Sequence, residues 1–149
     1  MAYFALVRSI MDYAAPIWDP YVTKHKHDME AVQRRGARFV KNDYSRYSSV
    51  TSMLSKLGWQ PLEERRRTAR LSLMFKISHN IVEVPASDFL IQADSRTRNS
   101  ELTYKHFTTH CEQYKNSFFP RTVPEWNKTS TEARRANTVD VFKNRLKRV

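Results

Sequence analysis

The chain has 149 residues, with 26 Lys and Arg against 15 Asp and Glu and a formal net charge of +11 at pH 7. This length suits one domain that buries about 70% of its unfolded surface. The basic balance indicates a polyanionic partner, which can be RNA, DNA or an anionic membrane face. Only two glycines occur, Gly36 and Gly58. They are too few for a turn-rich β-barrel or a glycine-rich phosphate loop, so the composition predicts a helical fold.

The single cysteine, Cys111, excludes an internal disulfide and a multi-thiolate zinc site within the chain. It fits a reducing compartment, so we expect an intracellular location, nuclear or cytoplasmic. Arg8 and Asp12 interrupt the apolar runs near the beginning of the chain. The sequence therefore predicts neither a signal peptide nor a membrane span, and no membrane partner is expected.

The first predicted helix lies at the beginning of the chain. Its apolar residues recur at the spacing of one helix face; they are Tyr3, Leu6, Val7, Ile10 and Ala14. Pro16 and Pro20 are expected to end this helix. Because the stripe begins almost at Met1, we expect the chain to start inside a structural element.

A second helix is predicted from about residue 24 to residue 41. Its buried side is expected to carry Met29, Val32, Gly36, Phe39 and Val40. On its other side Arg34, Arg38 and Lys41 are close to aligned, and Arg35 lies about 100° away around the helix. This helix therefore combines an apolar side with a basic one.

A short helix and a long helix are predicted next. A polar, aromatic surface connection over 42–49 leads into the short helix, which Ser48 or Ser49 caps and Gly58 stops. The long helix starts near Pro61, a favoured first-turn residue, and runs for about 20 residues. Its first half carries further arginines, namely Arg65, Arg66, Arg67 and Arg70.

The second half of the chain has weaker periodicity. Over 86–124 we expect a loop with short extended pieces and a turn bracketed by Pro120 and Pro124. This segment is rich in aromatic residues and contains the basic string SRTRN, with Arg96 and Arg98. Thr138 is expected to cap a last helix with the apolar stripe Val139, Phe142, Leu146 and Val149. The prediction is one mainly α domain of about four to five helices with an irregular, aromatic-rich extended segment in its second half.

The sequence offers no catalytic constellation. The acidic residues are scattered, and only Glu63 and Glu64 are adjacent; this pair suits the first turn of a helix. A two-metal polymerase or nuclease requires clustered carboxylates. His106 and His110, beside Cys111, have the spacing of two zinc ligands on a helix, but no second pair lies near, so surface or packing histidines are expected. We predict no catalytic residue, no metal, no cofactor and no small-molecule substrate.

Basic clusters interleaved with aromatic residues remain, and they point to nucleic acid. Arginine's planar fork suits phosphate oxygens and stacks on bases. The residues predicted to contact RNA or DNA are Arg34, Arg35, Arg38, Lys41, Arg65, Arg66, Arg67, Arg70, Arg96 and Arg98. The alternative is that these arginines are only the solvated faces of their helices.

Two groups of aromatic residues allow different interpretations. Tyr44 and Tyr47, beside Arg46, fit base stacking and anchoring of their own loop equally well. Trp18, Trp59 and Trp126 follow apolar or proline-flanked turns. Large aromatic side chains in such places usually pack helix ends into the core, and we expect that role for all three.

Several strings of this sequence, in order, resemble the carboxyl-terminal part of reverse transcriptases from non-LTR retrotransposons, above all the jockey-like group. The strings are LVRSIMDYAAPIWDP (6–20), VQRRGARFVKNDYSRYSSVTSMLSKLGWQPLEERRRTARL (32–71), SRTRN (95–99), YKNSFFPRTVPEWN (114–127) and FKNRL (142–146). The most specific pieces are LGW-x-x-L-x-x-RR and SFFPRT-x-x-x-WN. Ser9 stands where the family usually has proline, Gly36 where it commonly has alanine, and Lys128 to Ser130 where it usually has Leu-Pro.

The resemblance implies a piece of a larger RNA-directed DNA polymerase. Residues 1–20 would end a thumb-like helix, 21–84 would form a helical core, 85–124 an irregular segment and 125–149 a carboxyl-terminal helical part. The family's catalytic palm would lie upstream and be a partner of this segment, so the chain is expected not to be an enzyme by itself. Its implied role is to help hold template RNA and target DNA. The alternative is a structural or protein-interaction helical remnant.

Overall fold

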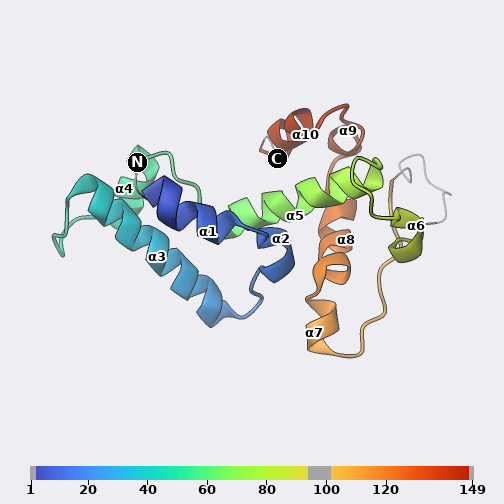
Figure 1. Ribbon diagram of the computed structural model, residues 1–149, viewed down its shortest axis with the longest axis horizontal. Helices are drawn as coiled ribbons and strands as arrows, with labels where there is room; N and C mark the ends of the chain where they lie inside the picture. The colour runs from blue at the N-terminus through green and yellow to red at the C-terminus, as the bar shows by residue number, and fades with distance from the viewer. Residues whose placement is uncertain (1–2, 94–101, 148–149) are drawn as a thin grey trace. The chain divides into compact units, whose positions relative to one another are not determined.

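The computed structural model describes residues 3–93 and 102–147. This part of the chain is mainly helical, as predicted; outside the helices, Gln92 and Tyr104 form one isolated antiparallel bridge. The chain divides into two compact units, Met1–Arg67 and Thr68–Val149 (Figure 1). The division falls inside a helix, whereas the sequence predicted one domain subdivided near residues 20, 84 and 124.

The first unit contains a π-helix, η1, and four α-helices, together with the beginning of a fifth. Their bounds are η1 Tyr3–Arg8, α1 Ser9–Asp12, α2 Ala15–Trp18, α3 Thr23–Lys41, α4 Val50–Lys56 and α5 Leu62–Ser78. The second unit continues from α5 with α6 Ala86–Phe89, α7 Glu112–Lys115, α8 Phe118–Lys128, α9 Thr131–Arg134 and α10 Val139–Leu146. Among the described residues the helices outnumber the predicted four to five, because short helices form where the apolar pattern is weak.

The beginning of the chain differs from the predicted single helix. A π-helix has wider turns than an α-helix, so the apolar face follows another spacing. Tyr3 and Met11 are buried and Val7 packs against them, whereas Leu6 and Ile10 are 66% and 74% exposed. The predicted stop at Pro16 is also wrong, because Pro16 occupies the first turn of α2, where a missing N–H costs nothing.

Helix α3 has almost the predicted bounds, and its predicted buried side is correct for Met29, which packs against the cluster of Tyr3, Met11 and Leu62, and for Gly36, but wrong for the three larger apolar residues. Gln33 and Ala37 are buried, whereas Val32, Phe39 and Val40 are 38%, 65% and 41% exposed. The buried arc follows the neighbours of α3. The Tyr3 ring lies against Gly36, and Ala37 packs with residues of α4. Gly36 and Ala37 are small enough to permit this close approach, whereas the buried Gln33 is held by a hydrogen bond from its Nε2 to Gln60 O at 3.0 Å.

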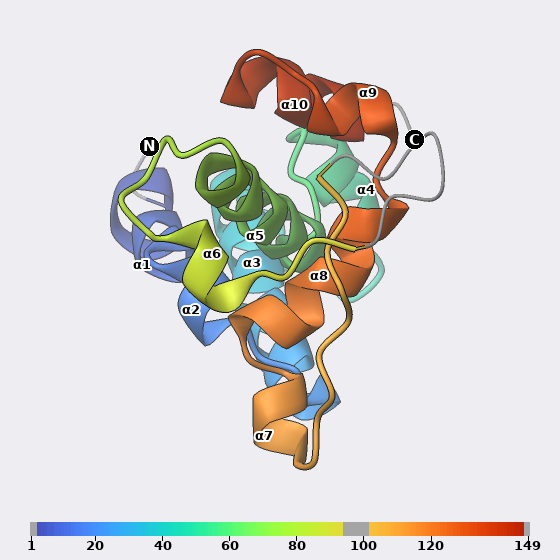
Figure 2. The ribbon, with the colours of Figure 1, turned by 90° about the vertical axis from the view of Figure 1, so that its right-hand side faces the viewer.

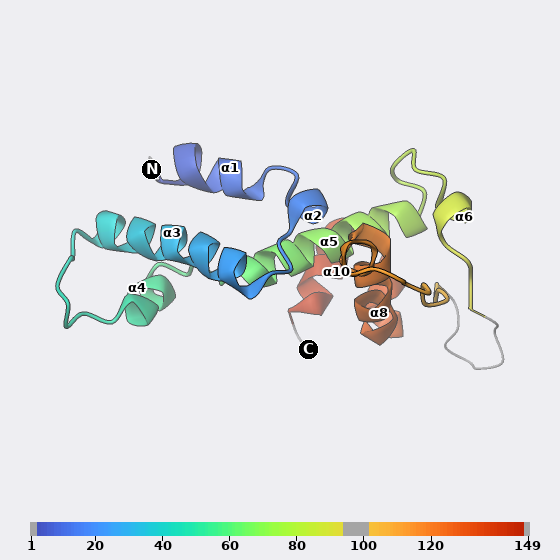
Figure 3. The ribbon, with the colours of Figure 1, turned by 90° about the horizontal axis from the view of Figure 1, so that it is seen from below.

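Helix α4 confirms the capping prediction. Ser49 is its N-cap and its hydroxyl accepts a hydrogen bond from Ser52 N at 3.4 Å. Gly58 follows the helix at φ 64°, a left-handed conformation that glycine adopts at little cost. Between α3 and α4 the loop 42–49 reverses the chain, and α4 returns alongside the carboxyl-terminal part of α3 (Figures 1 and 3).

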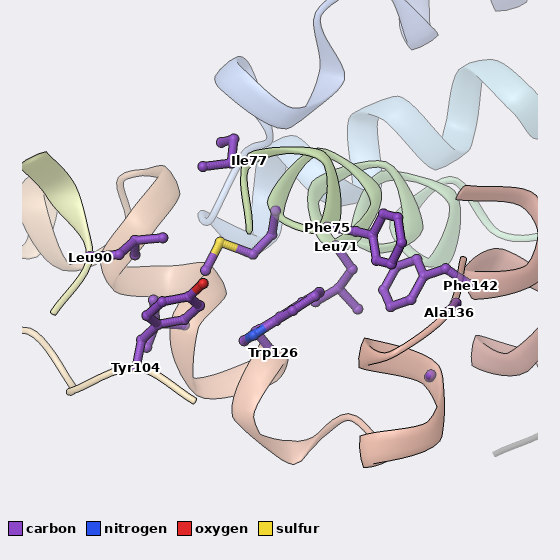
Figure 4. Close-up of a cluster of buried hydrophobic side chains, with 11 residues drawn as sticks. Leu71, Phe75, Ile77, Leu90, Tyr104, Trp126, Ala136 and Phe142 are labelled. Atoms are coloured by element: carbon purple, nitrogen blue, oxygen red, sulfur yellow. The ribbon is translucent and has the colours of Figure 1, made fainter. Parts of the chain in front are cut away.

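The second unit is built around one aromatic and aliphatic core. Helix α8 runs across α5, and α9 and α10 follow beyond its end (Figures 1 and 2). Phe75 of α5 stacks on Phe142 of α10 with ring centroids 4.8 Å apart, and Trp126 of α8 lies 5.7 Å from Phe142 (Figure 4). All three side chains are 0% exposed. The last helix begins as predicted, because Thr138 Oγ1 accepts a hydrogen bond from Val141 N.

The predicted irregular segment is partly helical. Pro120 and Pro124, expected to bracket a turn, both lie within α8. Pro120 stands in the first turn, where its missing N–H has no helical partner to lose. Pro124 stands further in, at a position that gives up one helical hydrogen bond.

Within the second unit, side chains of α8 and α9 hold the extended residues that precede α7. Asn127 exchanges two hydrogen bonds with the backbone of Tyr104, at 3.2 and 2.8 Å. Trp126 Nε1 donates to Leu102 O at 2.7 Å, and the buried Arg134 donates to Thr103 Oγ1 at 2.6 Å. Burial lowers the pKa of Arg134. Polar groups of α8 and α9 thus supply the backbone partners that a sheet would otherwise provide.

None of the helices in the described ranges carries an apolar stretch of the length that a bilayer crossing requires.

Candidate nucleic-acid interface

The outer face of α3 carries the first arginine cluster into solvent. Arg34, Arg35 and Lys41 are exposed. Within the described parts of the chain, no carboxylate forms an ion pair with any of the three. Their charges are therefore available to an external anion. Lys41 stands in the last turn of α3, where it also compensates the negative end of the helix macrodipole.

Arg38 shapes the end of the same helix. It is half-buried, and its Nη1 donates to Ser45 O at 2.9 Å and to Asp43 O at 3.4 Å. Both acceptors are carbonyl groups, so the positive charge of Arg38 is not neutralised by them. Arg38 therefore positions the loop 42–49, and its charge also attracts the Asp43 carboxylate.

The second predicted cluster has a different environment. Arg66 is 2% exposed and pairs with Asp19 at 2.8 Å, and Arg70 is 3% exposed and pairs with Glu125 at 2.7 Å. An arginine that is buried against a carboxylate presents no donor to a phosphate group outside. For Arg66 and Arg70 the structure therefore replaces the predicted nucleic-acid contact with a structural ion pair.

The other two arginines of this cluster are also held by carboxylates. Arg65 pairs with Asp12, and Arg67 pairs with Glu64 at 3.4 Å, one helical turn away. Both side chains retain some exposure, but their charge is compensated locally. Arg96 and Arg98, also predicted to bind nucleic acid, lie outside the described residues.

A groove of about 990 Å³ lies beside α3 in the first unit. Arg34 stands in its wall, with Leu54 of α4 and Trp59. Its ionisable lining includes both signs: Lys26, His27, Asp28, Glu30, Arg34 and Glu63. Lys26 and Glu63 form an ion pair at 2.6 Å. This mixed lining makes the groove itself a weak anion site; Arg34 belongs both to its wall and to the exposed basic side of α3.

Two tyrosines extend the basic face into the loop 42–49. Tyr44 and Tyr47 are 64% and 92% exposed, so they are not buried anchors of the loop. The sequence left base stacking and anchoring of the loop equally open for the two tyrosines, because a loop of this length and composition can hold a ring in either role. Arg46, between them, is also exposed.

The tryptophans do not all belong to the core. Trp126 is fully buried. Trp59 is half-buried and stacks on Tyr3 with centroids 4.3 Å apart. Trp18 is 37% exposed, and its indole N–H donates to the backbone carbonyl of Tyr13, which precedes α2. The core prediction was therefore wrong for Trp18, whose short helix offers no deep surface to cover a large ring.

The histidine and cysteine residues do not form a metal centre in the described structure. His106 and His110 are exposed and lie outside any helix, next to exposed Cys111. Across residues 3–93 and 102–147, no group of three or more His, Cys, Asp or Glu side chains converges with the geometry of a metal site.

Comparison with known proteins gives no match: no protein-family model, no curated protein and no solved structure is similar to this chain. The resemblance to non-LTR reverse transcriptases therefore rests on the quoted sequence strings alone.

Proposed function

We propose that this chain binds nucleic acid through the outer face of α3, as a non-catalytic part of a retrotransposon RNA-directed DNA polymerase that helps hold template RNA and target DNA. One observation carries the proposal: Arg34, Arg35 and Lys41 stand exposed and unneutralised by the described carboxylates, whereas the arginines of α5 are held in ion pairs. A net charge of +11 supports it through long-range attraction of a polyanion.

The physical basis is release of counterions from the phosphate backbone. Each phosphate that an arginine or lysine neutralises adds about 0.7 to 0.9 to the slope of log affinity against log salt. A face with three exposed cations and the nearby Arg38 can contact several phosphates at once. Arginines that are buried in ion pairs with carboxylates, such as Arg66, contribute nothing to that slope.

Fluorescence anisotropy with a labelled RNA hairpin and a DNA duplex of matched length, measured across a salt series, tests the proposal. The double variant Arg34→Glu, Arg35→Glu should lose most of the affinity and flatten the salt dependence, while circular dichroism stays that of the folded protein. Arg38 is left unchanged, because its replacement would also disturb the loop 42–49.

The matched control is Lys128→Glu, Lys147→Glu, which makes the same change in net charge at two exposed lysines of the second unit. This control should retain nearly wild-type binding at moderate salt. Equal losses in both double variants would mean that only net charge matters. A folded wild-type protein that binds neither probe at low salt would refute the proposal.

A second candidate function, protein interaction, is favoured by exposed apolar side chains in the segment 6–17, which comprises parts of η1, α1 and α2 and the turn before α2. Leu6, Ile10, Tyr13 and Ile17 are 66%, 74%, 80% and 80% exposed. Where large apolar side chains of this kind form a contiguous patch, the patch often marks a surface that another protein covers. The resemblance would assign that role to an upstream palm domain.

Sedimentation analysis of the wild-type chain and of Leu6→Gln, Ile10→Gln tests this candidate with a second copy as the partner. Self-association that the double variant abolishes would establish an interaction face. A monomeric wild-type protein that binds RNA with steep salt dependence would leave nucleic-acid binding as the better-supported function.

A further inference from the structure

The loop 42–49 exposes two aromatic rings directly beside the basic end of α3. Tyr44 is 64% exposed and Tyr47 is 92% exposed. Arg46 lies between them, and Lys41 precedes the loop; both are exposed. Figure 3 shows this loop at the end of α3, before the chain turns back into α4. Aromatic rings and cations thus share one small part of the surface.

Hydrogen bonds fix the backbone that presents these rings. Asp43 Oδ1 accepts from Ser45 N at 3.0 Å, and Ser45 Oγ accepts from Tyr47 N at 3.3 Å. Arg38 holds the carbonyl groups of Asp43 and Ser45 from the side of the helix. The hydrogen bond from the Ser48 side chain, and then that from the Ser45 amide, lower the pKa of Asp43.

Such a loop presents its side chains at a reduced entropic cost. A flexible loop would have to be ordered when a ligand binds, and that ordering would reduce the affinity. Here the turn, the Arg38 contacts and the Ser49 cap at the beginning of α4 already order the backbone. The exposed rings therefore need no rearrangement of the chain to meet a flat partner.

We propose that Tyr44 and Tyr47 form a stacking platform for unpaired bases, so that the ligand of the α3 face is a single-stranded polynucleotide rather than a duplex. This inference rests on the proposed function, because the cations of α3 would bind the phosphates of the same strand. Every base has a π-face on which a tyrosine can stack, whereas bases inside a duplex already stack on one another. Arg46 can add a contact between its guanidinium group and a base or phosphate.

The experiment compares the double variant Tyr44→Ala, Tyr47→Ala with the wild-type chain on four labelled probes of the same length. Two are single strands, an oligouridine RNA and an oligothymidine DNA, and two are blunt duplexes, one of RNA and one of DNA. The alanine variant should lose about tenfold or more in affinity for the single strands. Its affinity for the duplexes should change by less than about twofold, and its salt slope should stay the same, because the phosphate contacts remain. The preferred single strand identifies RNA or DNA as the natural ligand.

Two controls separate stacking from loss of the fold or of the loop. Tyr44→Phe, Tyr47→Phe keeps both rings and should retain single-strand binding. Tyr21→Ala removes another exposed tyrosine of the first unit, 45% exposed, and should have no effect. Far-ultraviolet circular dichroism verifies that each variant is folded.

Each outcome decides between the two proposals. Unchanged single-strand affinity in the alanine variant would overturn the stacking platform, while loss of binding in Arg34→Glu, Arg35→Glu would still support the proposed function. Equal losses on single strands and duplexes would also overturn stacking, because base accessibility would then play no part. Failure of the wild-type chain to bind any probe would refute the proposed function itself.

Discussion

Arg66 donates a hydrogen bond from Nε to Asp19 Oδ1 across 2.8 Å, and these side chains are only 2% and 4% exposed. The two residues are 47 positions apart in the chain, so the pair ties the segment after α2 to α5. Asp19 belongs to the string LVRSIMDYAAPIWDP and Arg66 to LGW-x-x-L-x-x-RR. Part of the resemblance to reverse transcriptases therefore lies in residues that stabilise the fold.

Removing one member of this pair should destabilise the protein strongly. Arg66→Gln removes a buried cation that lies 2.8 Å from the buried Asp19 carboxylate, and the expected cost is about 3–5 kcal/mol in the free energy of unfolding. The exposed Arg35→Gln is the matched control and should change it by no more than about 0.5 kcal/mol. Urea denaturation measures both values, and similar values for the two variants would contradict the structural role of Arg66.

Gly36→Ala should also destabilise the protein, although alanine favours helices. A Cβ atom at this position would lie 2.5 Å from Tyr3 Cε2 and 2.6 Å from Cδ2. Tyr3 is buried and stacked on Trp59, so its ring has little room to move. The cost of overpacking, about 1–3 kcal/mol, outweighs the gain of about 1 kcal/mol in helix propensity.

Thermal or urea denaturation of Gly36→Ala in two backgrounds checks this explanation. In Tyr3→Ala the opposing ring is absent, and there Gly36→Ala should be neutral or stabilising. A destabilisation of the same size in both backgrounds would show that the contact with Tyr3 is not its cause.

The tryptophans should differ in their contributions to stability. Trp126→Ala removes a fully buried ring and the hydrogen bond to Leu102 O, and it should cost about 3–5 kcal/mol. Trp18→Ala removes a partly exposed ring on a short helix and should cost clearly less. Denaturation curves of the two variants decide the matter; equal costs would place Trp18 in the core after all.

The Asp43 carboxyl group should titrate below its ordinary pKa of 3.8, because hydrogen bonds favour its charged form. For a carboxyl group with a lowered pKa, the stabilisation is present above the unfolded-state pKa and is lost as the pH falls through the folded-state pKa. The loop 42–49 should therefore keep its structure at neutral pH and loosen only in acid.

NMR titration of the side-chain carboxyl carbon measures this pKa directly. Ser48→Ala removes the largest contribution and should raise the pKa of Asp43 toward its ordinary value. Ser55→Ala, at an exposed serine of α4, is the control and should leave it unchanged. An Asp43 pKa that does not respond to Ser48→Ala would contradict the assigned cause.

Three helix boundaries could be predicted because their causes are local. Ser49, Gly58 and Thr138 act on backbone groups within a few residues, and a reader of the sequence sees those residues side by side. The basic character of α3 is local in the same sense, since Arg34, Arg35 and Lys41 follow one another along one helix. The net positive charge, the mainly helical fold and the Thr138 cap of the last helix could therefore all be predicted from the sequence.

The division of the arginines into exposed and buried ones was not predictable, because it depends on distant carboxylates. Asp19 and Glu125 lie 47 and 55 residues from the arginines they bind, and no spacing rule connects such positions. The same holds for the buried side of α3, which follows from Tyr3 and α4 rather than from its own apolar residues. The sequence by itself determined a basic, helical protein with two arginine clusters. Only the tertiary structure decided which cluster can meet a ligand, because burial and ion pairing are set by whatever packs against each helix.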